Sequence, residues 1–307
     1  VMSAWQHDPD VVGAFLFQIY RGLSRHERDV AESDVRELHK ATEQFTKAHP
    51  ENRVFRELSL DENDPLGSIA ALLKDQATED PVITDVRERV GRGELPLGLA
   101  AELAGRTYLE ACIKTAAGFV FSHLPSMTTA GQAAAVAAFD SRVVIDASAA
   151  ATLSLLDRAM VDQLVGAFLA LETTDTAYRD ALGAQQSLNM LSTMTLCWDA
   201  EHNRPLVTET SLDEAEALAR RAETVVELMT RSERRSWPGL KRFPESSGNG
   251  TWLSALDLAL SEQRVFWCDD WSLRQLAASE GARTFGTVDL LAALETAGFV
   301  VPELGDV

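Results

Sequence analysis

Apolar residues recur every three or four positions through most of the first 140 residues, as in DVVGAFLFQIYRGL and GLAAELAGRTYLEACIKTAAGFVF. Such a period places the apolar side chains on one face of a helix. Gly and Pro residues interrupt the pattern at intervals, so it predicts several separate helices. We therefore expect an all-helical N-terminal region over residues 1–128, which ends in a polar, Pro-containing linker, SHLPSMT, at Ser122–Thr128.

The pattern changes at Arg142. VVID is a short β-branched run that ends on an acid, and the helix-like stretch ASAAATLSLLDRAM follows at once. The same succession recurs in FLALETT before TAYRDALGAQQSLNML, RVFWCDD before WSLRQLAASEG, and ARTFGT before VDLLAALETAG. Strands that alternate with helices form parallel sheets with helices on both faces. The pattern therefore predicts a three-layer α/β/α domain over residues 141–307.

A stretch at about 190–250 interrupts this alternation. TLCWD and PLVTET flank the turn AEHNR, which predicts a hairpin. A long helix is expected from Ser211, because Ser211 and Glu214 form an S-x-x-E capping box. A loop with many basic residues follows. We interpret this hairpin, helix and loop as an insertion in the α/β domain.

Composition narrows the class of protein. The 307 residues include 28 Lys and Arg against 47 Asp and Glu, a formal charge of −19 that disfavours wholesale binding to nucleic acid. The three cysteines lie far apart, without the spacing of a disulfide framework or zinc knuckle. No stretch approaches the roughly 18 apolar residues of a membrane span. We expect a cytoplasmic protein that does not bind membranes. Because Val1 precedes Met2, an added residue and a longer parent with an upstream domain both stay open.

Acidic residues follow the predicted strands of the second half. Asp146 ends the first of these strands, and Asp269 and Asp270 end a later one. Asp175 and Asp180 follow the second strand, on or near the next helix. In an open parallel sheet the C-terminal ends of the strands share one edge, and ligands bind in the crevice there. We therefore expect these acids to converge.

Carboxylate oxygens are hard ligands that suit Mg²⁺ or Mn²⁺. Two such ions about 3.5–4 Å apart can activate water and stabilise the leaving oxygen in phosphodiester hydrolysis. A single Asp after a strand can equally well cap the next helix. Acids at three strand ends favour the metal site, because gathered like charges raise one another's pKa unless a cation is present.

Two motifs of the second half, VVIDASAAATLSLL and CDDWSLRQLAASEGARTFGTVDLLAAL, resemble those that open and close PIN-domain nucleases. In that family an acid, a helix ending in Gly, a short strand and a G-T pair before the last helix occur in this order. The resemblance covers residues 141 to 300, apart from 190–250. It implies a PIN-like sheet and a metal-dependent endoribonuclease that hydrolyses RNA with Mg or Mn.

The resemblance also implies roles for particular residues. Asp146 would be the first metal-binding acid and Asp270 the third, with Asp269 as its neighbour or substitute. Thr287, which follows Gly286, would help to hold a metal-bound water or phosphate. Asp289, at the start of the last helix, is a candidate fourth acid.

One family feature is missing. The second family acid is usually a Glu on the helix after strand two, but no Glu occurs between Glu172 and Glu201. Asp180 is the chosen replacement, with Asp175 as the alternative. Ser148 matches a small hydroxyl position of the family, or else caps a helix. This departure leaves open a catalytically weak PIN-like module that serves in binding or assembly.

A local basic excess supplies candidate contacts to RNA. Between residues 220 and 242 there are seven basic residues against three acids. Trp237 and Phe243 interleave with them, a composition typical of surfaces that bind phosphates and stack bases. The alternative is a solvated helix end and a loop anchored by a buried Trp. The candidate RNA-binding residues are Arg231, Arg234, Arg235, Lys241 and Arg242.

The N-terminal helices suggest a further function. LPLGLAAELAGRTYLEACIKTAA fits a helix-turn-helix with Gly105 in the turn, as in a DNA-binding regulator. The reader helix YLEACIKT has Lys114 as its only basic residue, which disfavours DNA reading. Packing, homodimerisation or contact with a protein partner suits these helices better.

Overall fold

The computed structural model describes two compact units, one of Val1–Thr78 with Met194–Thr208 and one of Glu79–Thr193 with Glu209–Val307. The linker expected at Ser122–Thr128 lies outside the described residues. The described residues are 12–13, 16, 19, 32–49, 64, 67–71, 74, 81–114, 129–189, 194–199, 202, 204–244 and 250–298.

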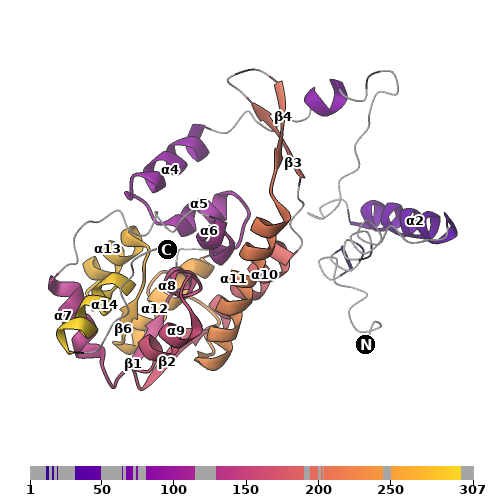
Figure 1. The fold of residues 1–307 in the computed structure, drawn as a ribbon. Coiled ribbons are helices and arrows are strands. Elements are labelled where there is room, and N and C mark those ends of the chain that lie inside the picture. The colour runs from indigo at the N-terminus through magenta and orange to yellow at the C-terminus, as the bar shows by residue number, and fades with distance from the viewer. Residues whose placement is uncertain are drawn as a thin grey trace. The chain divides into compact units, whose positions relative to one another are not determined.

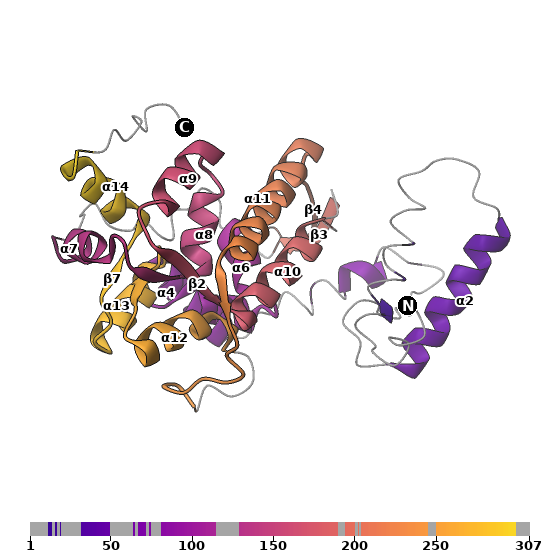
Figure 2. The same cartoon turned by 90° about the horizontal axis from the view of Figure 1, so that it is seen from below.

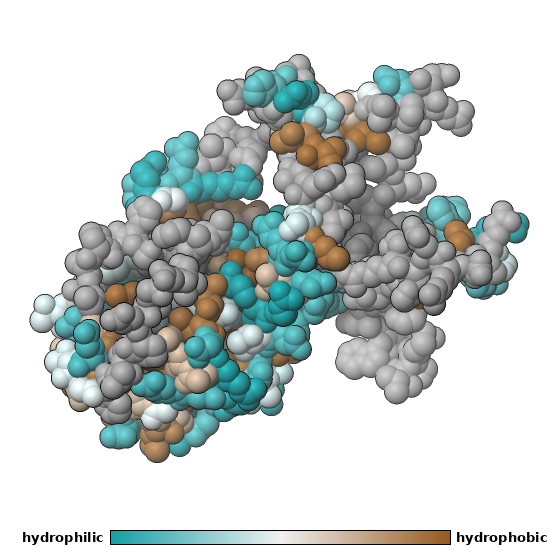
Figure 3. Space-filling model, viewed as in Figure 1, coloured by the Kyte–Doolittle hydropathy of each residue, from teal (hydrophilic) through white to brown (hydrophobic). Residues whose placement is uncertain are grey.

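The first unit contains the helix α2 (Glu32–Ala48) and the strands β3 (Met194–Asp199) and β4 (Arg204–Glu209). The two strands form a separate two-stranded sheet, which confirms the expected hairpin. Hydrophobic side chains gather on its surface in Figure 3. Exposed Leu206 and Val207 of β4 belong to this surface.

The second unit is built on a five-stranded parallel sheet with the order β5-β2-β1-β6-β7. Four of its strands were expected from the β-branched and aromatic runs. The fifth, β5, was missed because its three residues, ERR, show no apolar alternation. The strands are β1 (Arg142–Ile145), β2 (Ala170–Thr174), β5 (Glu233–Arg235), β6 (Val265–Trp267) and β7 (Thr284–Phe285).

Helices cover both faces of this sheet, which confirms the three-layer α/β/α architecture. In Figure 2, α8, α9 and α11 lie on one side of the strands and α12 and α13 on the other. The helices are α8 (Ala147–Leu153), α9 (Arg158–Val165), α10 (Asp175–Asn189), α11 (Leu212–Arg231), α12 (Ser254–Glu262), α13 (Trp271–Ser279) and α14 (Thr287–Thr296).

Two local features differ from the expected pattern. ASAAATLSLLDRAM forms two helices, because Asp157 caps α9 by accepting the N–H of Met160 at 2.8 Å. The stretch at 190–250 contributes α11, which packs on α10, and β5, which pairs with β2. The expected cap of α11 is present, since Ser211 accepts the N–H of Glu214. Much of that stretch is therefore continuous with the sheet.

Helices that precede β1 also pack in the second unit (Figure 1), and the N-terminal region is mostly helical, as expected. They are α4 (Pro81–Gly91), α5 (Leu97–Leu103), α6 (Tyr108–Lys114) and α7 (Thr129–Ala138). α7 packs on α14 and β7, and α6 packs on α8, α10 and α11.

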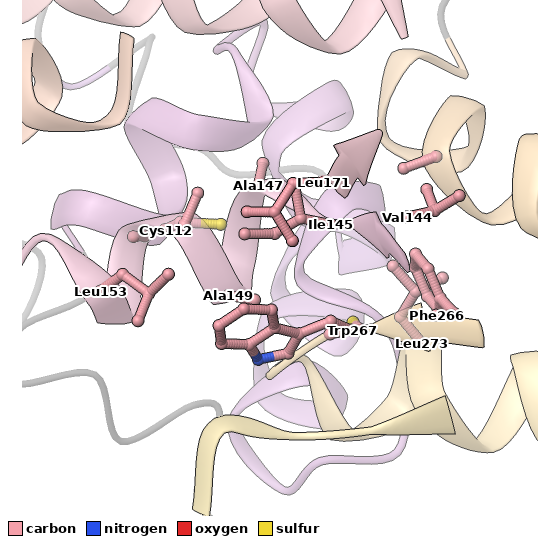
Figure 4. Close-up of a cluster of buried hydrophobic side chains, with 14 of the residues drawn as sticks. Cys112, Val144, Ile145, Ala147, Ala149, Leu153, Leu171, Phe266, Trp267 and Leu273 are labelled. Atoms are coloured by element: carbon pink, nitrogen blue, oxygen red, sulfur yellow. The ribbon is translucent and has the colours of Figure 1, made fainter. Parts of the chain in front are cut away.

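The core of the second unit lies between the sheet and these helices. Val144, Phe266 and Trp267 are fully buried, and the rings of Trp267 and Phe285 stack with centroids 5.6 Å apart. Figure 4 shows Cys112 of α6 in the same cluster, near side chains of α8 and β1. The helix α6 is thus part of this core. Within the described ranges, no helix combines the length and apolar character of a membrane span.

Candidate active site

The candidate site lies at the point in the sheet where the order of the strands changes direction. From β1 the chain continues to β2 on one side, whereas β6 and β7 lie on the other side of β1. The crevice between β1 and β6 is thus the topological switch point, where open α/β sheets bind ligands. Asp146 follows β1 directly, and Asp270 lies three residues after the end of β6. The structure therefore brings these two predicted acids to one crevice.

Asp146 and Asp270 each cap a helix. Asp146 precedes α8 and accepts the N–H of Ser148 at 2.9 Å. Asp270 precedes α13 and accepts the N–H of Leu273 at 3.1 Å. Each of these two carboxyl groups thus caps a helix and also lies at the switch point. Capping fixes each carboxylate at the end of its strand.

The Ser148 hydroxyl joins the two strand ends. Its oxygen donates to Asp146 Oδ2 and accepts the backbone N–H groups of Asp269 at 3.0 Å and Asp270 at 3.1 Å. The side chain is fully buried, as is its neighbour Cys268, whose sulfur lies 3.4 Å from the Ser148 oxygen. Ser148 therefore sets the spacing between the two acids. The resemblance implied a supporting role for Ser148, and the hydrogen bonds to Asp269 and Asp270 add a link between the two strand ends.

Asp180 reaches the site from α10. Its carboxylate accepts the backbone N–H of Tyr108 at 3.0 Å and that of Leu109 at 2.9 Å. Thr251 donates to it at 3.4 Å. Asp180 is thus bound to the start of α6.

The segment Leu97–Lys114, which comprises α5, α6 and the turn between them, covers the two switch-point acids. The Tyr108 hydroxyl donates to Asp146 Oδ2 at 3.1 Å and lies 3.4 Å from Asp270 Oδ2. The Leu97 N–H donates to Asp270 Oδ2 at 2.8 Å. We call this segment the cover segment. It leaves both switch-point acids only 1% exposed.

Burial makes these carboxyl groups hard to ionise. The pKa of Asp180 and that of Asp270 are each raised to about 6, mainly because burial removes water from the charged form. The negative charge of Asp146 raises both further. Burial also raises the pKa of Asp146 itself, and it raises that of the Tyr108 hydroxyl together with the charges of Asp146 and Asp270. Tyr108 is therefore a hydrogen-bond donor at neutral pH.

Asp269 points to a second group of polar side chains. Its two oxygens accept the backbone N–H and the hydroxyl of Thr287, both at 2.6 Å. The Thr287 hydroxyl also accepts the indole N–H of Trp267 at 3.1 Å. Asp269 thus joins the end of β6 to the start of α14. Burial raises the pKa of Asp269 as well.

Asp289 belongs to this second group. It accepts the N–H of Gly286 at 2.9 Å and pairs with the guanidinium of Arg274. A Cβ on Gly286 would lie 2.5 Å from an Arg274 nitrogen and 3.0 Å from Asp269 Oδ1, so a larger residue there requires the Arg274 side chain to shift. The contacts of Asp269, Thr287 and Asp289 therefore connect the joints of β6, β7 and α14.

Asp175, the alternative second acid, lies elsewhere. Its two oxygens accept the backbone N–H of Trp237 at 2.9 Å and the guanidinium of Arg179 at 3.1 Å. Trp237 is itself buried, at 4% exposure, and its indole N–H donates to Asp257 at 2.7 Å. Asp175 therefore holds the loop that follows β5, and the ring of Trp237 is enclosed by that loop.

The five candidate RNA-binding cations each have a contact within the fold. Arg231 pairs with Asp162 at 2.9 Å, Arg235 with Glu172 at 2.9 Å, and Arg242 with Glu280 at 3.7 Å. Arg234 lies over the Tyr178 ring and Lys241 over the Trp237 ring.

The two helices of the candidate helix-turn-helix are present as α5 and α6, but the second is buried. Gly105 has a left-handed φ of +62° in the turn between α5 and α6. Leu109 and Ile113 of α6 lie in the core, and Lys114 pairs with Glu110 at 2.6 Å. The apolar and basic side chains of α6 are thus used within the fold.

In this arrangement the three acids do not surround a common ion. Among the described residues, no group of three or more His, Cys, Asp or Glu side chains could hold a metal. The donor chemistry suits a hard cation, but N–H and O–H groups of the cover segment lie against Asp146, Asp180 and Asp270. The covered site therefore does not fit a shared Mg²⁺ or Mn²⁺.

The cover segment is the part of the site that the sequence did not reveal. Tyr108 is 38 residues from Asp146 and 162 residues from Asp270. Its apolar neighbours in α6 fit an ordinary packed helix, so no local pattern indicates that its hydroxyl meets two acids. Only the order of the strands and the packing of α6 bring these groups together.

Part of the second unit matches a known protein family. Residues 144–279 match the family described as the PIN domain associated with the TPR-GreAB-C-PIN system. The match includes Asp146, Asp180 and Asp270. No curated protein and no solved structure matches the chain. PIN domains have a nuclease-like fold and are typically dependent on divalent metals. The C-terminal half of this chain contains a PIN domain.

Proposed function

We propose that this protein is a Mg²⁺- or Mn²⁺-dependent endoribonuclease that hydrolyses phosphodiester bonds of cytoplasmic RNA. Asp146, Asp180 and Asp270 are its proposed metal-binding acids. The observation that supports this proposal most strongly is the meeting of Asp146 and Asp270 on one hydroxyl at the switch point of the sheet. Two carboxyl groups buried beside one hydroxyl lower the stability of the folded state, so their presence favours a functional role.

Four residues have supporting roles in this proposal. Ser148 positions the two switch-point acids through its three hydrogen bonds. Hydrogen bonds of Asp269, Thr287 and Asp289 connect β6, β7 and α14. These bonds hold the backbone next to Asp270 in place.

RNA binding is proposed for the basic residues around β5, namely Arg231, Arg234, Arg235, Lys241 and Arg242. The ion pairs of Arg231 and Arg242 are solvent-exposed. Exposed pairs contribute only about 0–1 kcal/mol, so phosphate groups can replace the carboxylates. Because Trp237 is buried, the binding proposed here is to the RNA backbone and does not involve stacking on that ring.

The activity is tested with single-stranded RNA and Mn²⁺. We expect endonucleolytic cleavage that Asp146→Asn and Asp270→Asn each abolish, because each removes a carboxylate of the site. Asp213→Asn is the matched control, since Asp213 is an exposed acid in the first turn of α11. Cleavage that persists in both switch-point variants would disprove the proposed function.

A second candidate is a catalytically weak PIN module that serves in binding or assembly. The specific observation in its favour is that the protein's own N–H and O–H groups satisfy the three acids. The two candidates differ once the cover segment is displaced. A ribonuclease then gains activity, whereas a binding module stays inactive.

A further inference from the structure

We propose that the cover segment, Leu97–Lys114, is a built-in inhibitor of the acidic site and that the site binds metal only when this segment moves away. This inference concerns regulation and rests on the proposed function. The structure shows the closed state, in which helix donors take the places that a cation and its water would need.

Hydrogen-bond donors of the cover segment bind each of the three acids. Leu97 begins α5, and Tyr108 and Leu109 begin α6. Backbone N–H groups in the first turn of a helix have no partner within the helix. Pro96, the N-cap of α5, provides no side-chain cap. Asp270 caps α5 and Asp180 caps α6 instead.

The same contacts exclude a cation. Mg²⁺ keeps near-octahedral oxygen coordination and several of its waters. In the closed state, Asp270 Oδ2 is bound by the Leu97 N–H and faces the Tyr108 hydroxyl, and Asp146 Oδ2 accepts from Ser148 and Tyr108. Metal binding and closure therefore compete for the same oxygens, so each must weaken the other.

Packing holds the cover segment in place. A Cβ on Gly98 of α5 would lie 2.3 Å from the Trp252 ring, so the helix lies directly on that indole. At the other end, Arg221 donates to the carbonyl of Ile113 at 3.1 Å and to Ala151 of α8 at 3.3 Å. The segment is thus attached at both ends and through the core side chains of α6, so opening requires these contacts to break and Leu109 and Ile113 to leave the core.

A large side chain in place of Gly98, which would act as a wedge between α5 and Trp252, tests the proposal. Gly98→Leu forces α5 and the Trp252 side chain apart. Gly91→Leu is the matched control, because a Cβ there meets nothing within 4 Å. We expect Gly98→Leu to bind Mn²⁺ at least tenfold more tightly than the wild type and Gly91→Leu, measured from the electron paramagnetic resonance signal of free Mn²⁺. Equal affinity in all three proteins would overturn the proposal.

Tyr108→Phe provides a test with little change in packing. It keeps the ring and removes the hydroxyl that faces both acids. Loss of one hydrogen bond to a charged group weakens the closed state, so we expect roughly tenfold tighter Mn²⁺ binding. Unchanged or weaker binding in a folded Tyr108→Phe protein would contradict inhibition by the cover segment.

A disulfide can lock the segment closed. A Cβ at Gly183 of α10 would lie 3.1 Å from Cγ2 of Thr107. Side chains at these two positions are therefore in contact, as the short Cβ–Cβ separation of a disulfide requires. We expect the oxidised Thr107→Cys, Gly183→Cys protein to lose Mn²⁺ binding and RNA cleavage and to regain both on reduction. Each single substitution is the control, and undiminished Mn²⁺ binding in the oxidised protein would overturn the proposal.

Failure of this inference and failure of the proposed function give different results. If only the function is wrong, Mn²⁺ affinity responds to Gly98→Leu and to the disulfide, but no variant cleaves RNA. If only the inhibition is wrong, the wild type cleaves RNA through Asp146 and Asp270, and neither the wedge nor the disulfide changes the rate or the Mn²⁺ affinity.

Discussion

The hydroxyl oxygen of Ser148 lies 3.1 Å from the backbone nitrogen of Asp270, and the same hydroxyl donates to Asp146. One buried oxygen thereby ties the C-terminal ends of β1 and β6. Ser148 is two residues after Asp146 and 122 residues before Asp270, so only the parallel pairing of β1 with β6 makes this contact. The separation of the two switch-point acids depends on it.

Ser148→Ala should lower both stability and activity. The change leaves the N–H groups of Asp269 and Asp270 without their acceptor, and each buried unsatisfied group costs about 1–3 kcal/mol. We expect the free energy of unfolding in urea to fall by roughly that amount or more, and any RNA cleavage to fall with it. Ser279→Ala, at an exposed hydroxyl in α13, is the control and should have little effect. A Ser148→Ala protein as stable as the control would show that Ser148 does not join the strands.

The metal-free protein should become less stable as the pH rises from about 4 to about 6. The pKa of Asp180 and of Asp270 lies near 6 in the folded state, against 3.8 ordinarily. The folded state therefore binds more protons than the unfolded state in this window, and the free energy of unfolding falls with increasing pH. The loss approaches ~3 kcal/mol per group, at about 1.36 kcal/mol per pKa unit.

Urea unfolding at several pH values measures this effect. Asp180→Asn cannot ionise, so its free energy of unfolding should change less between pH 4 and 6 than that of the wild type, whatever its absolute level. An identical slope in the two proteins would show that Asp180 is not held in its neutral form by burial.

Gly286→Ala should destabilise the joint between β7 and α14. The added Cβ would lie 2.5 Å from Arg274 and 3.0 Å from Asp269, so the Arg274 pair with Asp289 must shift. Overpacking of this kind costs typically 1–3 kcal/mol. Gly239→Ala is the control, since its Cβ meets nothing within 4 Å. Thermal unfolding of the two variants compares them, and equal melting temperatures would contradict the tight contact.

RNA binding through the basic residues predicts a specific response to salt. If Arg234 and Lys241 contact phosphates, replacing both with Gln should weaken binding to single-stranded RNA. It should also reduce the slope of log affinity against log salt concentration, by about 0.7 for each lost contact. The measurement uses the catalytically inactive Asp146→Asn protein. A slope that does not change would assign RNA binding to another surface.

Sequence patterns predicted the framework of the sheet because its buried strands are rich in Val, Phe and Trp and end at acids. They missed β5, whose charged edge residues lack alternation, and they treated α11 as part of an insertion although it packs on α10. The acids at the strand ends could be predicted, since position alone places them at one edge.

The environment of those acids could not be predicted from local patterns. Tyr108 meets Asp146 and Asp270 only because α6 packs against α8 and α10. The contacts of Asp175 with Trp237 and of Asp289 with Arg274 likewise join distant parts of the chain. Homodimerisation and an additional protein partner stay predictions for the N-terminal helices.

The most direct test of the central claim is Mn²⁺-dependent cleavage of single-stranded RNA by the Gly98→Leu protein, with and without Asp146→Asn. We predict a faster rate than in the wild type and in Gly91→Leu, and complete loss of that rate when Asp146→Asn is added. Failure of Gly98→Leu to cleave RNA although it binds Mn²⁺, or equal cleavage after Asp146→Asn, would contradict a covered ribonuclease site at the ends of β1 and β6.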